Sequence, residues 1–271
     1  MQDQQGNPVQ APAPFAGAPL LSVEGVTVRF RGIVALEQVS FDVQAGQIAG
    51  LIGPNGAGKT TLFNCLSRLY DYSEGAIRFD RQPLEGLARH RMAHIGIGRT
   101  FQNLALFRTM TVLDNIKVGR HSRTRKGFLA NVLRTPGVAA EEAESEERAR
   151  ELVRFLALES VAQQRVADLP FGTQKRVELG RALACEPRLL LLDEPASGLN
   201  HEEVASLGSL IRQIRDELKT TILLVEHHMS LVMSVSDKVV ALNFGRKIAE
   251  GTPAEVRQHP DVIQAYLGSA A

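Results

Sequence analysis

Residues 53–61 form a glycine-rich segment whose residue types and spacing suit phosphate binding. They match the phosphate-loop pattern G-x-x-x-x-G-K-[ST] without a mismatch. The glycines let the backbone turn its N–H groups toward phosphate oxygens, and the lysine adds a mobile positive charge. The segment predicts that the chain binds a nucleoside triphosphate such as ATP through Gly53, Pro54, Asn55, Gly56, Ala57, Gly58, Lys59, Thr60 and Thr61.

Two carboxylates end an apolar run and are suited to phosphate hydrolysis. The run Leu189–Leu192 predicts a buried strand, which places Asp193 and Glu194 at the sheet edge where nucleotides bind in open α/β folds. Asp193 is then a partner of Mg²⁺, commonly through water, and the Thr60 hydroxyl is a second Mg²⁺ ligand. Glu194 is positioned to polarise a water for attack on the γ-phosphate. An acidic strand end is common by itself, but its pairing with the phosphate loop indicates hydrolysis.

Gln102 and His227 each follow a predicted strand. The Gln102 amide is a candidate to reach the metal or the attacking water, and the His227 ring is a candidate partner of the γ-phosphate. Taken alone, Gln102 is typical of a surface residue and His227 of a structural one. Their occurrence together with the loop and the carboxylates favours the catalytic interpretation.

A glycine turn opens a further helix in the segment Leu169–Leu183. Gly172 and Thr173 lie where the free N–H groups of this helix would bind a second anion. The alternative is a plain helix start with Thr173 as its capping residue.

Alternating strands and helices must hold these residues in place. The apolar run Ile48–Ile52 predicts a buried strand before the phosphate loop, and a helix over Lys59–Leu69 is expected after it. Apolar residues alternate over 23–30 and 39–43, which predicts half-buried antiparallel strands. The fold class is therefore predicted to be α/β, a mostly parallel sheet with an antiparallel flank. Further strands are predicted at Ala76–Phe79, Ile95–Thr100, Leu189–Leu192, Thr221–Val225 and Lys238–Leu242, with Arg246–Ala249 as a hairpin partner across residues 243–245.

The chain divides into a tail, a nucleotide-binding core and an inserted helical lobe. Residues 1–20 are rich in proline, glutamine and glycine, and they predict a disordered tail. Residues 21–268 are expected to form one domain, in which strand patterning gives way to helical periodicity over about 111–180. The basic stretch 117–126 within this lobe is either a solvated loop or a contact with a membrane-embedded partner or acidic lipid heads.

The overall composition is that of an ordinary globular protein. Of 271 residues, 44% are hydrophobic and 23% charged, and the net charge of +1 gives no reason to expect a nucleic-acid partner. No apolar run approaches the roughly 18 residues that a membrane span needs, and the absence of a basic residue before Arg29 argues against a signal peptide. Cys65 and Cys185 share no metal or redox spacing and are expected to be buried, reduced and inert.

Taken in order along the chain, these motifs resemble those of an ABC-transporter ATPase subunit over Leu21–Leu267. The resemblance implies a P-loop NTPase core in which Phe30 stacks on adenine. It further implies that Glu194 is the catalytic base and that His227 senses the γ-phosphate. The resemblance rests on the phosphate loop, Gln102, residues 172–183, residues 189–194, Ser197–Asn200 and His227, and it implies that Thr60, Gln102 and Asp193 surround Mg²⁺.

The same resemblance implies a second ABC ATPase subunit, bound head to tail, whose site Gly172 and Thr173 complete. Two positions depart from the family pattern. Pro170 replaces the usual serine of L-S-G-G-Q and lacks its hydroxyl and N–H, and Asn200 replaces the usual aspartate. Both departures suggest a heterodimer with unequal sites, and a homodimer is the alternative.

Within the family, the chain resembles the ATP-binding subunits of branched-chain amino acid uptake systems of the Liv type. The features that carry this are Phe171–Gly172, Gly198–Asn200, Val225–Met229, the insert 127–137 and the ending 261–268. This implies a peripheral subunit at the cytoplasmic face of the membrane that couples ATP hydrolysis to uptake through two permease subunits, served by an external substrate-binding protein. Urea or amide importers and lipopolysaccharide-export ATPases are the alternatives within the family. A soluble ABC-type clamp in translation or DNA repair is the alternative from another class, and a small-molecule kinase is a rival that the carboxylate pair does not favour.

Overall fold

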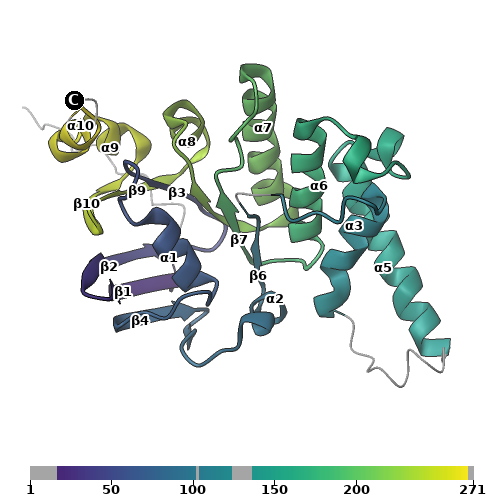
Figure 1. The fold of residues 1–271 in the computed structure, drawn as a ribbon, viewed down its shortest axis with the longest axis horizontal. Coiled ribbons are helices and arrows are strands. Elements are labelled where there is room, and N and C mark those ends of the chain that lie inside the picture. The colour runs from purple at the N-terminus through teal and green to yellow at the C-terminus, as the bar shows by residue number, and fades with distance from the viewer. Residues whose placement is uncertain (1–16, 102–103, 124–135, 268–271) are drawn as a thin grey trace, which may run out of the picture.

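Residues 17–101, 104–123 and 136–267, as described by a computed structural model, fold around two β-sheets (Figure 1). The larger sheet has the strand order β10-β9-β3-β8-β7-β6, and the smaller has the order β2-β1-β4-β5. All strands of the larger sheet pair in parallel except β10, which is antiparallel to β9. The predicted α/β class with an antiparallel flank is therefore confirmed. The strands are β1 (Leu21–Phe30), β2 (Ile33–Val43), β3 (Ile48–Ile52), β4 (Glu74–Phe79), β5 (Gln82–Pro83), β6 (Ile97–Arg99), β7 (Leu189–Asp193), β8 (Thr221–Val225), β9 (Lys238–Asn243) and β10 (Arg246–Gly251).

Helices cover both faces of the larger sheet, and α1 lies between the two sheets (Figure 1). Strand β7 shows how its apolar run is divided: Leu190 and Leu192 pack with the helical side, whereas Leu189 and Leu191 pack with α1 and the smaller sheet. A strand buried on both faces reads as a continuous apolar run, as this one does. The helices are α1 (Lys59–Leu66), α2 (Met92–Ile95), α3 (Val112–Gly119), α5 (Pro136–Phe155), α6 (Phe171–Leu183), α7 (His201–Leu218), α8 (Met229–Val235), α9 (Pro253–Gln258) and α10 (Pro260–Leu267), with short 3-10 turns η1 (Arg89–Arg91), η2 (Arg120–Arg123), η3 (Glu159–Val161) and η4 (Val166–Asp168).

Two predicted element boundaries are wrong. Ile95 ends helix α2 instead of beginning a strand, because Gly96 adopts a left-handed conformation with φ of 98° and β6 begins only after it. The helix after the phosphate loop ends at Leu66, and the N–H of Leu69 turns back to the Asn64 carbonyl at 2.8 Å. Such left-handed residues close helices at little cost when they are glycine. The hairpin across residues 243–245 is confirmed.

The regular structure between β6 and β7 is helical among the described residues, apart from one isolated bridge between Thr111 and Arg165. Helices α3, α5 and α6 share an apolar interior that includes Ile116, Val153 and Leu179. Two residues of the basic stretch form ion pairs here, Lys117 with Glu146 at 3.5 Å and Arg120 with Glu186 at 2.8 Å. Arg125 and Lys126 lie outside the described residues.

The N-terminal end of the described chain and the two cysteines are both part of the packed structure. Most of the expected tail lies outside the described residues, but Leu20 is buried and its N–H donates to the Val43 carbonyl at 2.9 Å. Leu20 is therefore part of the packed structure, one residue before the expected start of the domain. Cys65 and Cys185 are buried and are not joined in a disulfide, as predicted. Among the described helices, none is both long enough and apolar enough to cross a membrane.

Candidate active site

The phosphate loop connects β3 to α1 with a backbone that requires glycine. Gly53, Gly56 and Gly58 all have positive φ, at 152°, 80° and 100°. A Cβ on Gly53 would collide with the Leu242 carbonyl, and one on Gly58 would lie 2.7 Å from a methyl of Leu36. Because Gly58 caps α1 without a side chain, the N–H groups of the first helical turn stay available to an anion.

Lys59 is buried inside this loop. Its ammonium donates to the carbonyls of Gly53 at 2.6 Å and Pro54 at 3.0 Å, so the charge is held in the concavity of the loop. Burial lowers the pKa of Lys59, while the nearby charges of Glu194 and Asp193 act in the opposite direction. The structure thus brings the lysine and both predicted carboxylates into one electrostatic neighbourhood.

Asp193, at the end of β7, is held by an arginine that the sequence interpretation missed. Arg99 on β6 contacts the Asp193 carboxylate at 2.8 Å, and both side chains are largely buried. The same guanidinium donates to the Asn64 side chain of α1 at 3.0 Å. The N–H of Asp193 donates to the Thr100 hydroxyl at 3.3 Å. Arg99 therefore ties the carboxylate to the helix that follows the phosphate loop.

Glu194 adopts an unusual backbone conformation directly after β7. Its φ of 47° is left-handed, which costs a non-glycine residue about 1–3 kcal/mol, and its N–H donates to the Val225 carbonyl at 2.9 Å. This bond ties the residue to β8 and directs its carboxylate to the edge of the sheet. The nearest ring nitrogen of His227 lies 3.9 Å from it.

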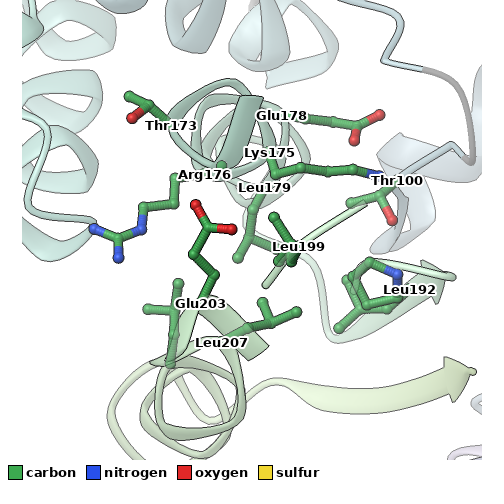
Figure 2. Close-up of a pocket in the computed structure, with 13 residues that line it drawn as sticks. Thr100, Thr173, Lys175, Arg176, Glu178, Leu179, Leu192, Leu199, Glu203 and Leu207 are labelled. Carbon is green, nitrogen blue, oxygen red and sulfur yellow. The ribbon is translucent and has the colours of Figure 1, made fainter. Parts of the chain in front are cut away.

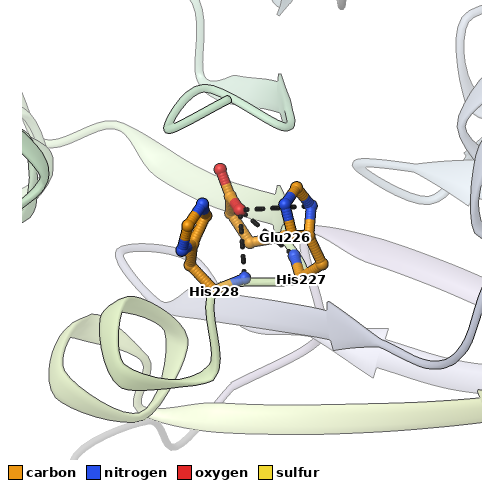
Figure 3. Close-up of side chains that lie close together, drawn as sticks. All are labelled: Glu226, His227 and His228. Carbon is orange, nitrogen blue, oxygen red and sulfur yellow. Dashed lines mark hydrogen bonds and ion pairs between the residues drawn. The ribbon is translucent and has the colours of Figure 1, made fainter. Parts of the chain in front are cut away.

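Glu226 organises the turn that carries His227, and the sequence interpretation missed it too (Figure 3). Its fully buried carboxylate accepts the backbone N–H groups of His227 at 3.1 Å and His228 at 3.3 Å, and that of Ala196 at 2.6 Å. The three side chains of residues 226–228 are close enough together to hold a metal ion. The carboxylate is nevertheless already occupied by three donors, so its role here is to fix the segments after β7 and β8.

A half-open pocket of about 500 Å³ joins the phosphate loop to Glu194. Apolar side chains of Ile33, Val34 and Phe244 form its outer wall. Phe30 is not among its lining residues, and its ring packs edge-on against Tyr70 with centroids 5.3 Å apart. The stacking of adenine on Phe30 therefore stays a prediction. The polar lining comprises Asn55, Gly56, Gly58, Lys59, Thr60, Thr61 and Glu194.

Gly172 and Thr173 lie in the first turn of α6 and line a different cavity from the phosphate loop. The capping alternative for Thr173 is wrong, since α6 begins at Phe171 and Pro170 occupies the capping position without a side-chain hydrogen bond. The structure thus does not bring these two residues to the pocket of their own chain. Their phosphate-binding role stays a prediction.

Gln102 lies outside the described residues, but side chains of α6 form hydrogen bonds with the backbone on both sides of it. Buried Glu178 accepts the N–H of Phe101 at 3.1 Å, and Arg181 donates to the Ala105 carbonyl. Burial raises the pKa of the Glu178 carboxyl, and the N–H of Phe101 is the largest opposing influence. The sequence feature that could have identified Glu178 is a charged residue on an apolar helix face. Because its carboxylate is buried and accepts a backbone N–H of this loop, Glu178 holds the loop in place.

A phosphate loop after a central parallel strand, with two carboxylates at the end of β7 in the same parallel sheet, defines a P-loop ATPase. Residues 36–197 match the family model described as ABC transporter, and residues 246–271 match that described as branched-chain amino acid ATP-binding cassette transporter. The chain belongs to the ABC transporter family, as one of the ATP-hydrolysing cassettes that drive transport.

Two curated relatives and two solved structures illustrate the similarity. The chain is 44% identical to the high-affinity branched-chain amino acid transport ATP-binding protein BraF of Pseudomonas aeruginosa and 43% identical to LivG of Escherichia coli. Each alignment covers 93% of this chain and 99% of the relative. A crystal structure of an ABC-transporter cassette in its ADP conformation is 29% identical, with a TM-score of 0.81 over 93% of this chain and all of that one. A dimeric cassette at 24% identity and a TM-score of 0.73 shows the shared fold.

Proposed function

We propose that this chain is the ATPase subunit of an importer for branched-chain amino acids. The two relatives named for that transport and the match of residues 246–271 support the substrate class. The single observation that supports the ATPase activity is the pocket that Lys59 and Glu194 line together. Hydrolysis at that pocket would supply the free energy for uptake.

The roles of the residues follow from their positions. Loop N–H groups and Lys59 bind the phosphates of ATP, and Glu194 orients the attacking water. His227 contacts the γ-phosphate from the end of β8. Thr60 and Asp193 offer hydroxyl and carboxylate oxygens, which are ligands that Mg²⁺ prefers, and bound Mg²⁺ would neutralise phosphate charge. Gln102 is the proposed third member of that group.

A second ABC ATPase subunit is proposed to complete the site. Gly172 and Thr173 do not line the pocket of their own phosphate loop, which supports a role at the partner's site. Asn200 is accounted for locally, because its side chain caps α7 by accepting the N–H of Glu203 at 3.0 Å. The proline at position 170 supports a heterodimer with unequal sites over a homodimer.

Permease contact is proposed at a groove of about 490 Å³ between the sheet and the helical region. Its lining includes the exposed apolar side chains of Phe101 and Val118 beside Arg89 and Arg181. A helical segment of either of two permease subunits is the proposed occupant, which would place the chain peripherally at the cytoplasmic face of the membrane. The external substrate-binding protein would act on this chain only through the permeases.

Uptake competition tests the substrate. A strain lacking this protein should lose high-affinity uptake of labelled leucine, and the restored gene should give uptake that isoleucine and valine compete for. Competition by urea or amides instead would favour the alternative importers. Unchanged leucine uptake, or co-purification with ribosomes instead of permeases, would contradict the proposal.

A further inference from the structure

Arg99 lies between the phosphate-loop pocket and the groove proposed for the permease. Its guanidinium contacts the Asp193 carboxylate at 2.8 Å, and the two side chains are only 9% and 5% exposed. The same arginine lines the groove, together with Ser67 and Phe101. One side chain is therefore shared by a carboxylate that is proposed to bind Mg²⁺ and by a surface that is proposed to bind a partner.

The guanidinium is attached to α1 through one of its two terminal nitrogens. Nη1 donates to the Phe63 carbonyl at 3.3 Å, to the Asn64 side chain at 3.0 Å and to the Ser67 hydroxyl. The other terminal nitrogen, Nη2, donates to Asp193. Because the two attachments use different atoms, the contact with Asp193 can be released while α1 still holds the side chain.

Two aromatic rings lie beside the guanidinium, and one of its donors is unsatisfied. The central carbon lies 5.7 Å from the ring centroid of Phe63 and 5.2 Å from that of Phe101. A ring face attracts a cation, so both rings help to keep the guanidinium at this position. The buried Nε of Arg99 has no hydrogen-bond partner among the described residues. An unsatisfied donor makes this position less favourable, which lowers the cost of moving the guanidinium.

The backbone of Asp193 is held separately from its side chain. Thr100, which follows Arg99, lines a different cavity between α6 and α7, where Glu178 is also found (Figure 2). The Thr100 hydroxyl accepts the N–H of Asp193 at 3.3 Å. The end of β7 is thus fixed from the side of α6, while the carboxylate meets the positive charges of Arg99 and the nearby Lys59.

We propose that Arg99 competes with Mg²⁺ for Asp193 and thereby sets how tightly the site holds the metal. Both are cations that are attracted to one carboxylate, and like charges at close range repel each other. Arg99 therefore gives up the contact of Nη2 with Asp193 when the metal binds, while Nη1 stays on α1. This inference rests on the proposed role of Asp193 as a Mg²⁺ ligand, which the experiment tests separately.

Phe101 connects this competition to the groove. Its ring is 40% exposed, and its N–H donates to the buried carboxylate of Glu178. A segment bound in the groove would contact the ring that keeps the guanidinium in place, and it would change how strongly Arg99 opposes the metal. This consequence rests on the proposed permease contact, whereas the competition itself does not.

Mg²⁺ titration of the full-length purified chain, with a fluorescent non-hydrolysable ATP analogue at fixed concentration, tests the competition. The measured quantity is the Mg²⁺ concentration that gives half of the maximal response. Arg99→Gln should lower this concentration about three- to tenfold, because a competing positive charge is removed. If Arg99 were only a structural tie, its loss would raise the concentration, since a less ordered site binds the metal more weakly.

Arg188→Gln is the matched control and should leave the Mg²⁺ requirement unchanged. Arg188 also pairs with an aspartate, Asp80, at 2.6 Å and lies 5.6 Å from the ring centroid of Phe79. It lines neither the phosphate-loop pocket nor the groove. The control therefore removes the same charge and the same kinds of contact at another place.

Phe101→Leu is a second variant that keeps both members of the ion pair. Loss of the ring should weaken the hold on the guanidinium and lower the half-saturating Mg²⁺ concentration about twofold or more. The same change should have no further effect in Arg99→Gln, because the ring acts through the guanidinium.

Asp193→Asn separates this inference from the proposed metal site. The change should raise the half-saturating Mg²⁺ concentration, and an unchanged value would contradict both the proposed ligand and the competition. Where Asp193→Asn does weaken Mg²⁺ binding, two results would overturn the competition alone. One is an unchanged or raised Mg²⁺ requirement in Arg99→Gln, and the other is full additivity of Arg99→Gln and Phe101→Leu.

Discussion

The phosphate-loop pocket and the start of α6 differ in how complete they are within one chain. In the pocket, Lys59 is held by two carbonyls, Asp193 by Arg99, and Glu194 by the Val225 carbonyl. These are the residues proposed to act on the bound nucleotide, and groups that are already held in place need no rearrangement when charge develops.

The start of α6 has no comparable support. Pro170 offers no side-chain cap, and the adjacent Phe171 ring is 46% exposed. Gly172 and Thr173 face a separate cavity. The chain therefore holds its own phosphate-loop pocket in place, whereas the start of α6 lacks such support, as expected if α6 acts on the site of the proposed second subunit.

Replacing Glu194 by glutamine should have the largest effect of the substitutions, and it tests the phosphate-loop pocket. Loss of a general base lowers turnover about 10²- to 10⁴-fold, while the loop and Lys59 should still bind ATP. Phosphate release and nucleotide binding, measured side by side, check this. Glu202→Gln, at an exposed position in the first turn of α7, is the control and should keep turnover. Normal phosphate release by Glu194→Gln would remove this residue from the base role.

Arg99→Met should have the next largest effect, and it tests whether the phosphate-loop pocket depends on the buried ion pair between Arg99 and Asp193. Removing one partner of such a pair leaves an uncompensated charge, which costs about 3–5 kcal/mol of folding free energy. Chemical unfolding measures the loss. A double change with Asp193→Asn should recover part of it, because the unpaired charge is then gone. Equal stability of Arg99→Met and the unaltered chain would show that the pair contributes little.

The local geometry of the pocket was predictable from sequence because short-range patterns dictate it. The glycine spacing gave the loop, and the apolar runs gave β3, β7 and β8, since each run sits next to the residues it positions. The errors at Ile95 and Thr173 have local causes as well. A left-handed Gly96 and a proline at position 170 moved the boundaries by a few residues.

The supporting side chains were not predictable, because their partners are distant in sequence. Arg99 meets a residue 94 positions away, Glu178 one 77 away and Glu226 one 30 away. Only the packed sheet brings these groups together. A charged residue on an otherwise apolar element, such as Glu178, indicates that its side chain has a polar partner, but the sequence does not identify that partner.

Pro170→Ser should have the smallest effect, and it tests whether the start of α6 acts on the site of a second subunit. Serine is a preferred capping residue and restores a hydroxyl that can donate to a phosphate, and one such hydrogen bond is worth about two- to tenfold in rate. Hydrolysis by the reconstituted transporter should therefore rise, with little change in the isolated chain. Pro253→Ser, at the first turn of α9, is the matched control. An equal rise in the isolated chain would place the effect within one chain and end the idea that α6 acts on a partner's site.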